Sequence, residues 1–438
     1  MGIKIGIIGA GSSYTPDLFA SLVDSGISVE VDEAVLMDKN LEAADRIARV
    51  SQGILHSAGK KTKISSTDSL KAAISGADII LLQVRVGGLA ARVRDETLPM
   101  ALGMVGNEEI GAGGIVCGLR NVTAILEIAR QIERISPQAV VLCLANPSGM
   151  LAEALLSQTS LRVIGYCNIP INMTYDLAKV LNVAPDRIRL DFIGINHLGW
   201  IRGATVDGEE CLQAIIQGTR SREDILYRYG LVDPLVEPEF LRALGMLPAW
   251  YLRYYYFPEK TMEEDRQQGP KGEQDMASDR RLAELYETKG YSEEARQILV
   301  RKGGERIYLP VLQTIDSIWN DRGDLIVADV KNRNATPDLP PESVLEIPAR
   351  FYRDREEPAP IGPLPLQVRG LVQAVKASEQ LTIKAVLTGD RGTALAALMT
   401  NPLVGSFDKA SAFLDRALAE ERQYLPQFFT STQPFVSQ

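Results

Sequence analysis

The chain has 438 residues, of which 45% are hydrophobic and 24% are charged, and this composition is ordinary for a protein with a large buried core. It excludes a disordered chain, a fibrous chain and a small disulfide scaffold. The formal net charge is −9, so the chain lacks the overall positive charge that would hold nucleic acid or an anionic membrane. We therefore expect neither a nucleic-acid partner nor a membrane partner.

Short apolar runs alternate with amphipathic segments through the first half of the chain. We predict strands at Ile3–Ile8, Ala34–Met37, Asp78–Leu82, Ala139–Leu144, Arg162–Tyr166 and Leu190–Ile195. We predict helices between them at Pro16–Ser25, Leu41–Ala58, Val122–Ile135 and Ile171–Leu181. This alternation is typical of an α/β fold with a doubly wound parallel sheet, as in Rossmann-like domains.

The pattern changes beyond about residue 200, where helical periodicity dominates. The charged segment Pro258–Arg281 contains Gly269, Pro270 and Gly272, which predicts a mobile loop. Eight of the 23 prolines lie between Pro337 and Pro365, which predicts extended, irregular backbone. From Leu366 onward, a pattern rich in Ala and Leu again predicts helices.

A glycine-rich turn follows the first predicted strand. Gly9 and Gly11 allow the backbone to turn tightly and to approach a pyrophosphate, which the N-terminus of the next helix attracts. Ser12 and Ser13 follow where the usual third glycine is missing. Asp38 ends the second strand, where a carboxylate can bind a ribose 2′-hydroxyl, and this favours NAD over NADP.

A cysteine and a histidine follow two later strands. Cys167 lies at the carboxyl end of one strand and near a helix N-terminus, which we expect to lower the pKa of its thiol. His197 follows another strand, and an imidazole meeting a thiolate there could hold a divalent metal. Spacing alone favours the alternative that the two residues are unrelated, because two ligands make a weak metal signature.

The remaining cysteines and histidine give no further site. No CxxC pair occurs among the four cysteines, which excludes the usual structural zinc and disulfide patterns. Free thiols, no recognisable leader and no apolar run of membrane-spanning length favour a cytoplasmic location. Only His56 and His197 are present, which excludes any mechanism that needs a cluster of histidines.

Several motifs occur together in an order that resembles glycoside hydrolase family 4. They are GSSYTP at 11–16, RVGG at 85–88, VGNEEIGAGG at 105–114, ANP at 145–147, CNIP at 167–170, GINHLGW at 194–200 and YLRYYY at 251–256. The similarity extends into the segment around EIPARFYRDREEPAPIGPLP and the helical region after it. It therefore spans roughly residues 3 to 404.

The resemblance implies an enzyme that uses NAD and a divalent metal such as Mn²⁺. It implies a fold like that of lactate and malate dehydrogenases, with an NAD-binding domain over residues 1–196 and a mostly helical α+β domain over residues 197–438 for substrate, metal and oligomer contacts. The implied route is an exception to the two-carboxylate scheme. NAD oxidises the sugar at carbon 3, a base removes the proton at carbon 2, the aglycone is eliminated, water adds, and NADH returns its hydride.

The resemblance also assigns the metal ligands and the base. Cys167 and His197 match the metal ligands, and Tyr251 matches the base. A phenol can act as a base only if its pKa falls, which a nearby cation could achieve. Tyr254 and Tyr255 share the predicted helical face of Tyr251, so they remain rival assignments.

Five further residues match positions that contact ligands in the family. Arg92 matches an arginine that binds the 6-phosphate of the substrate, and guanidinium suits phosphate oxygens. Glu108 and Asn146 match residues that hold sugar hydroxyls, and Arg85 is assigned to the cofactor. Asn168 is of the type carried by 6-phospho-β-glucosidases, whereas members that act on 6-phospho-α-glucosides carry Asp there.

Three departures from the family leave alternatives open. Lys271 stands where many relatives have a second arginine, and it keeps the charge but loses the planar fork. Asn107 and Ile110, and the segment 302–312, also differ from the common pattern. The first interpretation is a 6-phospho-β-glucosidase that forms a homodimer or homotetramer. The alternatives are a family member acting on an unphosphorylated or α-linked glycoside, an NAD-dependent 2-hydroxyacid dehydrogenase, and a non-catalytic NAD-binding regulator.

Overall fold

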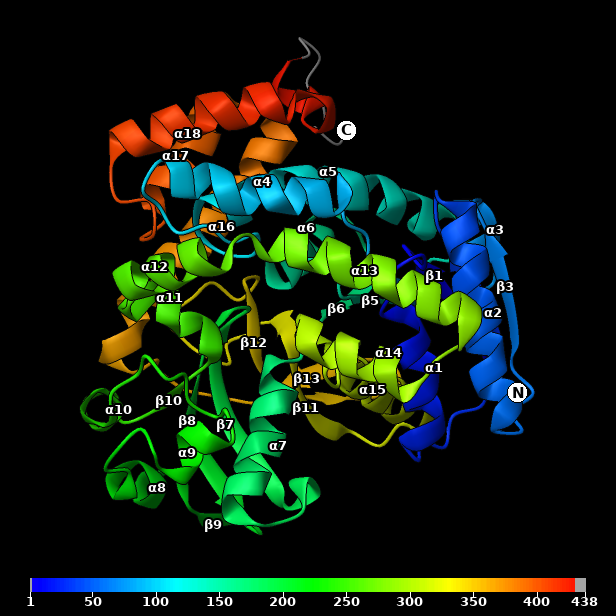
Figure 1. Ribbon diagram of the computed structural model, residues 1–438, viewed down its shortest axis with the longest axis horizontal. Coiled ribbons are helices and arrows are strands. Elements are labelled where there is room, and N and C mark those ends of the chain that lie inside the picture. Colours follow the sequence, from blue (N-terminus) through cyan, green and yellow to red (C-terminus); the bar gives the residue numbers. More distant parts are fainter. Residues whose placement is uncertain (1, 430–438) are drawn as a thin grey trace.

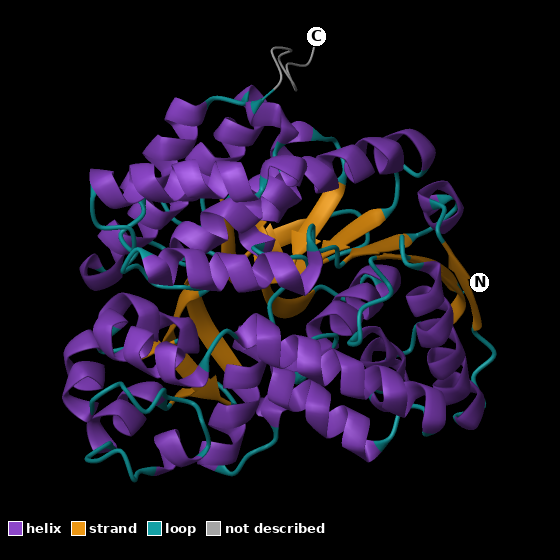
Figure 2. Ribbon diagram, turned by 45° about the horizontal axis from the view of Figure 1, so that its top comes forward, coloured by secondary structure: helices purple, strands orange, loops and turns teal. Residues whose placement is uncertain are grey.

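The computed structural model describes residues 2–429, and a nine-stranded sheet runs through its centre (Figures 1 and 2). The strand order is β13-β12-β11-β6-β5-β4-β1-β2-β3. These strands are β1 (Ile3–Ile8), β2 (Val31–Met37), β3 (Lys63–Thr67), β4 (Ile79–Leu82), β5 (Val140–Cys143), β6 (Arg162–Gly165), β11 (Asp324–Lys331), β12 (Val344–Phe351) and β13 (Glu356–Pro358). The six strands from β1 to β6 are parallel, in the order 3-2-1-4-5-6 of a doubly wound dinucleotide fold.

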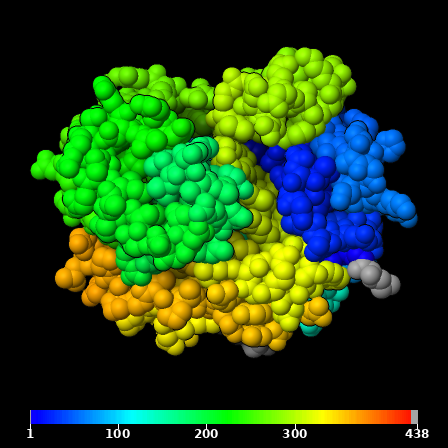
Figure 3. Space-filling model, turned by 90° about the horizontal axis from the view of Figure 1, so that it is seen from below, coloured from blue at the N-terminus to red at the C-terminus, as the bar shows by residue number. Residues whose placement is uncertain are grey.

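Helices cover both faces of this sheet, and the side chains of each strand alternate between two apolar cores. One face carries α1 (Thr15–Asp24), α2 (Leu41–Ser57), α7 (Ile169–Leu181) and α15 (Leu309–Asn320). The other carries α3 (Leu70–Ile74), α4 (Gly88–Ala101), α5 (Gly111–Ile135), α6 (Ser148–Gln158), α17 (Arg391–Thr400) and α18 (Phe407–Glu420). Helix α16 (Leu366–Thr388) contributes its first half to the first core and its second half to the other. Figure 3 shows from below that yellow segments of the second half of the chain lie between the green lobe and the blue N-terminal part.

Helix α5 is longer than predicted because it begins at Gly111 rather than at Val122. It is long and apolar enough to cross a membrane by length and composition alone. However, 78% of its most apolar window is buried inside the protein, where it packs against α4, α6 and α16. Its apolar character is therefore that of a core helix.

From residue 188 the chain forms a second, smaller sheet instead of continuing the central parallel sheet. Strands β7 (Ile188–Ile195) and β8 (Leu198–Val206) form an antiparallel hairpin, with β10 (Leu247–Pro248) and β9 (Glu209–Glu210) pairing to β8. The prediction that the strand at 190–195 belongs to another parallel strand–helix unit is therefore wrong. Short helices α8 (Leu212–Gly218), α9 (Ile225–Arg228) and α10 (Pro238–Leu244) follow this sheet in the chain.

The segment 258–281 is helical, so the prediction of a mobile loop is wrong. It forms α12 (Pro258–Gln268) and α13 (Lys271–Thr288), which follow α11 (Arg253–Tyr256). Gly269 (φ +73°) ends α12 and Pro270 precedes the first residue of α13, so the two breakers separate two helices. After α13 come α14 (Glu293–Leu299) and η3 (Val300–Gly304), a π-helical turn.

The proline-rich region completes the large sheet. Its backbone is extended as predicted, but β12 and β13 make much of it regular rather than irregular. Strand β11 pairs antiparallel to β6, and β12 and β13 continue the sheet outward. The central sheet takes strands from both sides of residue 196, so the sheet itself does not mark a domain boundary there. The division of the chain into two domains at residue 196 remains a prediction.

Candidate active site

A cavity of about 1880 Å³ opens at the carboxyl ends of β1, β2, β4, β5 and β6. Ligands of doubly wound folds bind at this edge of the sheet. The volume exceeds the range of about 300–1,000 Å³ that is typical for one drug-sized ligand. The wall opposite the strands comes from α11, α12, α13 and η3, so both halves of the chain enclose the space.

The turn after β1 forms one end of the cavity. The backbone N–H groups of Gly9 and Ala10 both donate to the Met37 carbonyl at 2.9 Å. Gly9 has a φ of +87°, and a Cβ there would lie 2.8 Å from the Gln83 carbonyl oxygen, so the turn requires glycine. The carboxylate of Asp38 accepts from the N–H of Gly11 at 2.9 Å, and it lines the cavity as expected for a ribose contact.

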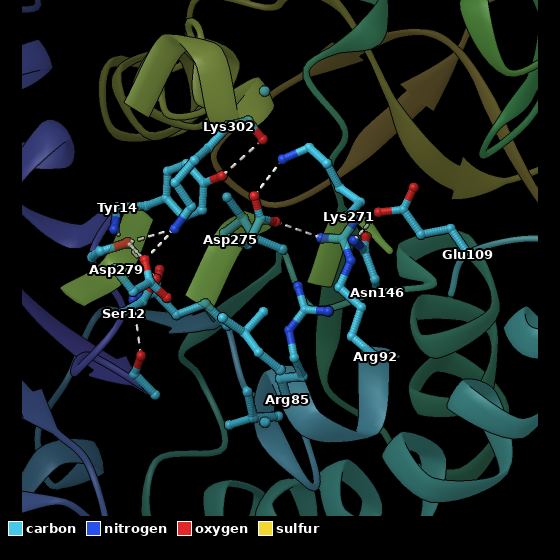
Figure 4. Close-up of a pocket in the computed structure, with 18 of the residues that line it drawn as sticks. Ser12, Tyr14, Arg85, Arg92, Glu109, Asn146, Lys271, Asp275, Asp279 and Lys302 are labelled. Carbon is cyan, nitrogen blue, oxygen red and sulfur yellow. Dashed lines mark hydrogen bonds and ion pairs between the residues drawn. The ribbon is translucent and has the colours of Figure 1, made fainter. Parts of the chain in front are cut away.

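Side chains from the far half of the chain reach this turn. Ser13 Oγ donates to Asp279 Oδ1 at 2.7 Å, and Lys302 Nζ donates to Ser13 Oγ at 3.0 Å and also contacts Asp279 (Figure 4). Tyr286 donates to the Ser13 carbonyl at 2.6 Å. Ser12 also lines the cavity. Lys302 and Asp279 lie more than 260 residues from the turn and have no local motif, so they were not predicted from the sequence.

Cys167 and His197 converge at the other end of the cavity. Cys167 follows β6, and His197 occupies the tight turn between β7 and β8 with a φ of +61°. The side chain of Asn196 holds this turn, since Oδ1 accepts from the Gly149 N–H and Nδ2 donates to Glu346, both at 3.4 Å. As a result, Cys167 Sγ lies 3.4 Å from His197 Nε2.

These two donor atoms fit a shared divalent cation. For comparison, zinc–sulfur and zinc–nitrogen bonds of about 2.3 and 2.0–2.1 Å place two neighbouring ligand atoms at about this separation. Burial lowers the pKa of His197, which favours the neutral, metal-binding imidazole. Burial together with the charges of Glu346 and Glu109 raises the pKa of Cys167 and outweighs the lowering by the Ile169 N–H at the helix N-terminus, so the expected net lowering is wrong. The thiolate therefore requires a nearby positive charge.

Tyr251 lies directly beside this pair. Its ring stacks on His197 with centroids 4.4 Å apart and an interplanar angle of 26°. Its hydroxyl donates to Glu109 Oε2, and burial followed by the charge of Glu109 raises the pKa of Tyr251. Tyr254 also lines the cavity, with its ring 6.2 Å from that of Tyr251, whereas Tyr255 is absent from the lining.

Glu109 contacts His197, Asn146 and Tyr251, and it was not among the site residues predicted from the sequence. Its Oε2 lies 3.5 Å from His197 Nε2, and its Oε1 accepts from the side chain of Asn146. Burial raises the pKa of Glu109, but His197, Arg92 and the Tyr251 hydroxyl outweigh burial and lower it overall. The doubled acid in VGNEEIGAGG, within an otherwise Gly-rich and apolar stretch, was the available signal.

Its neighbour Glu108, which was expected to hold sugar hydroxyls, is 1% exposed. Its oxygens face two guanidinium groups, that of Arg85 in contact and that of Arg92 at 3.0 Å. Glu108 is not among the residues that line the cavity, and its ion pairs orient the two arginines that do. Arg85 and Arg92 themselves line the cavity, and their contacts with ligands remain a prediction.

The two cations expected at the phosphate lie together between the ends of the cavity (Figure 4). Arg92 Nη1 is 3.0 Å from Asp275 Oδ2, and Lys271 Nζ contacts Asp275 Oδ1. Arg92 Nε also donates to Glu96 Oε1 at 2.8 Å. The structure therefore brings Arg92 and Lys271 together, as the resemblance implies, but each is paired with a carboxylate.

Asn168 faces η3 through its amide group. Its Nδ2 donates to the carbonyl oxygens of Gly303 at 2.7 Å and Glu305 at 2.9 Å. Both hydrogens of the amide are thus used to hold the segment after α14 against the cavity. A carboxylate at this position could not donate either bond.

Models of known protein families match nearly the whole chain. The family 4 glycosyl hydrolase model matches residues 4–183, and the model of the C-terminal domain of family 4 glycosyl hydrolases matches residues 192–404. A probable 6-phospho-β-glucosidase from Bacillus subtilis is 34% identical over 98% of both chains. A phospho-α-glucosidase from Clostridium acetobutylicum is 26% identical over 96% of this chain and 98% of its own.

Solved structures agree with the fold. A 6-phospho-β-glucosidase from Thermotoga maritima, solved with manganese, NAD⁺ and glucose 6-phosphate, has a TM-score of 0.87 at 27% identity and covers 96% of this chain and 99% of its own. A lactate dehydrogenase from a deep-sea metagenome reaches a TM-score of 0.56 at 15% identity, covering 88% of this chain and 99% of its own. The predicted α/β fold of the dehydrogenase type, with a helix-rich C-terminal part, is therefore confirmed.

Proposed function

Because the chain belongs to family 4 of the glycosyl hydrolases, we propose that it hydrolyses 6-phospho-β-glucosides with the help of NAD and a divalent cation such as Mn²⁺. The convergence of Cys167, His197 and Tyr251 carries this proposal, since the three side chains meet in the same cavity as the Gly9–Gly11 turn. The B. subtilis and T. maritima relatives, and the ligands of the latter, support the substrate class and both cofactors.

The residues divide the cavity into three parts with separate tasks. The turn after β1 and Asp38 would hold the dinucleotide, and Cys167 and His197 would hold the cation. Arg92 and Lys271 would bind the phosphate of the sugar. When bound, NAD supplies hydride transfer and the cation supplies Lewis-acid chemistry at the neighbouring sugar oxygens.

Tyr251 would remove the proton from carbon 2 of the oxidised sugar. Its hydroxyl lies on the cavity wall, and its ring is fixed against His197. The buried position of the phenol raises its pKa, so positive charge nearby is what would let it accept a proton at neutral pH. Glu109 receives the hydrogen bond of this hydroxyl and so orients it.

The preference for β-linked substrates rests on Asn168. Its two amide hydrogens bind the carbonyl oxygens of Gly303 and Glu305, which an aspartate could not do. The family resemblance associates Asn at this position with 6-phospho-β-glucosides and Asp with the α-linked substrates. An α-linked phosphoglycoside is the second candidate substrate, because the C. acetobutylicum relative is a phospho-α-glucosidase.

The test compares aryl 6-phospho-β-glucoside, aryl 6-phospho-α-glucoside and the plain aryl β-glucoside, each with and without NAD and Mn²⁺. The proposal predicts rapid cleavage of the first substrate only, with both cofactors required. Faster cleavage of the α-linked compound would reverse the anomeric assignment. Net accumulation of NADH with a 2-hydroxy acid would identify a dehydrogenase, and cleavage without NAD would contradict the redox route. The predicted dimer or tetramer can be measured on the same sample by light scattering.

A further inference from the structure

The two cations proposed to bind the substrate phosphate already share one buried carboxylate. Asp275 Oδ2 lies 3.0 Å from Arg92 Nη1, and Asp275 Oδ1 contacts Lys271 Nζ. The side chain of Asp275 is only 3% exposed, yet it lines the cavity together with both cations (Figure 4). Each carboxylate oxygen therefore faces one of the two positive groups.

Close packing of two helices fixes Asp275 in this place. Helix α13 meets α4 at Gly272, where a Cβ would lie 2.8 Å from Val93 Cγ2 and 3.1 Å from the Val93 nitrogen. The N–H of Gly272 donates to Glu96 Oε2 at 2.9 Å, and the other oxygen of Glu96 accepts from Arg92. Asp275 follows one turn later on α13, so the packing at Gly272 sets the position of its backbone beside the two cations.

This arrangement has an electrostatic consequence for any anion that enters. A phosphate that reaches Arg92 and Lys271 meets the negative charge of Asp275 where little water screens it. Glu96 and Glu108 add charge of the same sign on the far side of Arg92. The cations gain less from binding phosphate than they would if the carboxylate were absent.

We infer that Asp275 is a specificity-determining residue that limits how tightly this subsite holds phosphate. In the empty site it orients Arg92 and Lys271, and in the occupied site it weakens their attraction for the ligand. This inference rests on the proposed function, in which substrate and sugar product carry the same phosphate. A moderate hold then allows the product to leave, since product release limits the turnover of many enzymes.

The experiment replaces the carboxylate by its neutral isostere in Asp275→Asn. Glucose 6-phosphate and glucose are titrated by calorimetry into wild-type and variant enzyme loaded with NAD and Mn²⁺. We expect the Kd for glucose 6-phosphate to fall roughly tenfold or more, while the Kd for glucose stays unchanged. Inhibition of turnover by glucose 6-phosphate should strengthen by the same factor.

The control is Glu273→Gln, which removes the same charge from an exposed position on the same turn of α13 and should leave both Kd values unchanged. If Asp275→Asn does not accumulate as folded protein, Asp275→Ser is measured with the same expectation. Unchanged or weaker binding of glucose 6-phosphate by the folded variant would overturn the inference. The proposed function is judged separately: a wild-type enzyme that cleaves only the plain glycoside would refute it, while a gain of phosphate binding in Asp275→Asn would still support the role of Asp275.

Discussion

The two working ends of the cavity differ in how completely their charges are paired. At the metal end, Cys167 and His197 face each other with their donor atoms 3.4 Å apart, beside Glu109 and with no cationic side chain between them among the described residues. At the phosphate end, Arg92 and Lys271 already contact the carboxylate of Asp275. The metal end requires a positive ion to be electrostatically complete, whereas the phosphate end is complete without an anion.

This difference indicates where binding energy is concentrated. A thiol whose pKa is raised by burial and by two carboxylates gains strongly from a cation, because the cation stabilises the thiolate. A phosphate entering a site whose cations are already paired gains less, because the carboxylate of Asp275 offsets part of their positive charge. Changes at the metal end should therefore have the larger effects, and changes at the phosphate end should be graded.

The sharpest way to break the metal end is Cys167→Ser. We expect Mn²⁺ affinity to fall roughly a hundredfold or more and turnover to be lost, because a serine hydroxyl does not ionise to replace the thiolate. Electron paramagnetic resonance of free Mn²⁺ measures the affinity without relying on activity. Cys211→Ser is the matched control, since that thiol donates to the Ala204 carbonyl and Cys211 is not among the described residues that line the cavity. Unchanged metal affinity in Cys167→Ser would show that Cys167 is not a metal ligand and would refute the proposed metal site.

The base beside the metal end is tested by Tyr251→Phe, which keeps the ring against His197 and removes only the hydroxyl. We expect kcat to fall roughly 10²–10⁴-fold, the usual contribution of acid–base catalysis. Incorporation of solvent deuterium at carbon 2 of the product should fall in parallel. Tyr255→Phe is the control, because its buried hydroxyl makes no hydrogen bond among the described residues. Product free of deuterium from active wild-type enzyme would point to direct displacement at the anomeric carbon.

At the phosphate end, Arg92→Ala should raise KM for the phosphorylated substrate by roughly ten- to a hundredfold with a smaller change in kcat. Arg92→Lys keeps the charge but loses the fork, so its KM should be intermediate. Lys271→Arg should bind the substrate equally well or better. Steady-state kinetics with the phosphorylated and plain glycosides measure the contrast. Equal kcat/KM values for the two compounds in the wild type would show that the phosphate contributes nothing to substrate recognition.

The smallest effect is expected beneath the metal end, at Asp329. This fully buried carboxyl accepts a hydrogen bond from Ser148, and burial raises its pKa from 3.8 to about 7. The folded protein therefore binds this proton more tightly than the unfolded chain, and the carboxyl lowers stability as the pH rises from about 4 to 7.

Asp329→Asn should accordingly raise the free energy of unfolding by about 1–3 kcal/mol at pH 8 relative to its effect at pH 5. Denaturant unfolding of both proteins at the two pH values gives the difference. A variant whose stability relative to the wild type is the same at both pH values would show that Asp329 does not titrate in this range.

The sequence was most informative where local pattern and chemistry coincide. The parallel strands other than β3 and the turn at Gly9–Gly11 were predictable, because each depends on residues in a strand or directly after its carboxyl end. The approach of Cys167 to His197 was implied only by the family resemblance, because spacing alone favoured two unrelated residues. Strand β3 was missed, since four of its five residues KISST are polar and none of the five is fully buried. The helices at 258–281 were missed because Gly269 and Pro270 separate two helices, and local composition does not show this.

The electrostatics of the site were the least predictable part. A helix N-terminus near Cys167 can be read from the sequence, but the burial and the two carboxylates that raise its pKa cannot. Glu109 and Asp275 were overlooked for a related reason, since acidic residues are usually exposed and solvated. Only the packing of distant segments places them against Tyr251 and Arg92.

The way in which β11, β12 and β13 complete the central sheet limits how the protein can be dissected. A fragment that stops at residue 196 would leave β6 as a bare sheet edge, with the apolar residues Val163 and Ile164 deprived of their cover from the second half. Such an edge recruits other strands, so the fragment should aggregate rather than persist as an isolated cofactor-binding module. Shuffling of the two halves between relatives would meet the same obstacle, because the halves share one set of backbone hydrogen bonds.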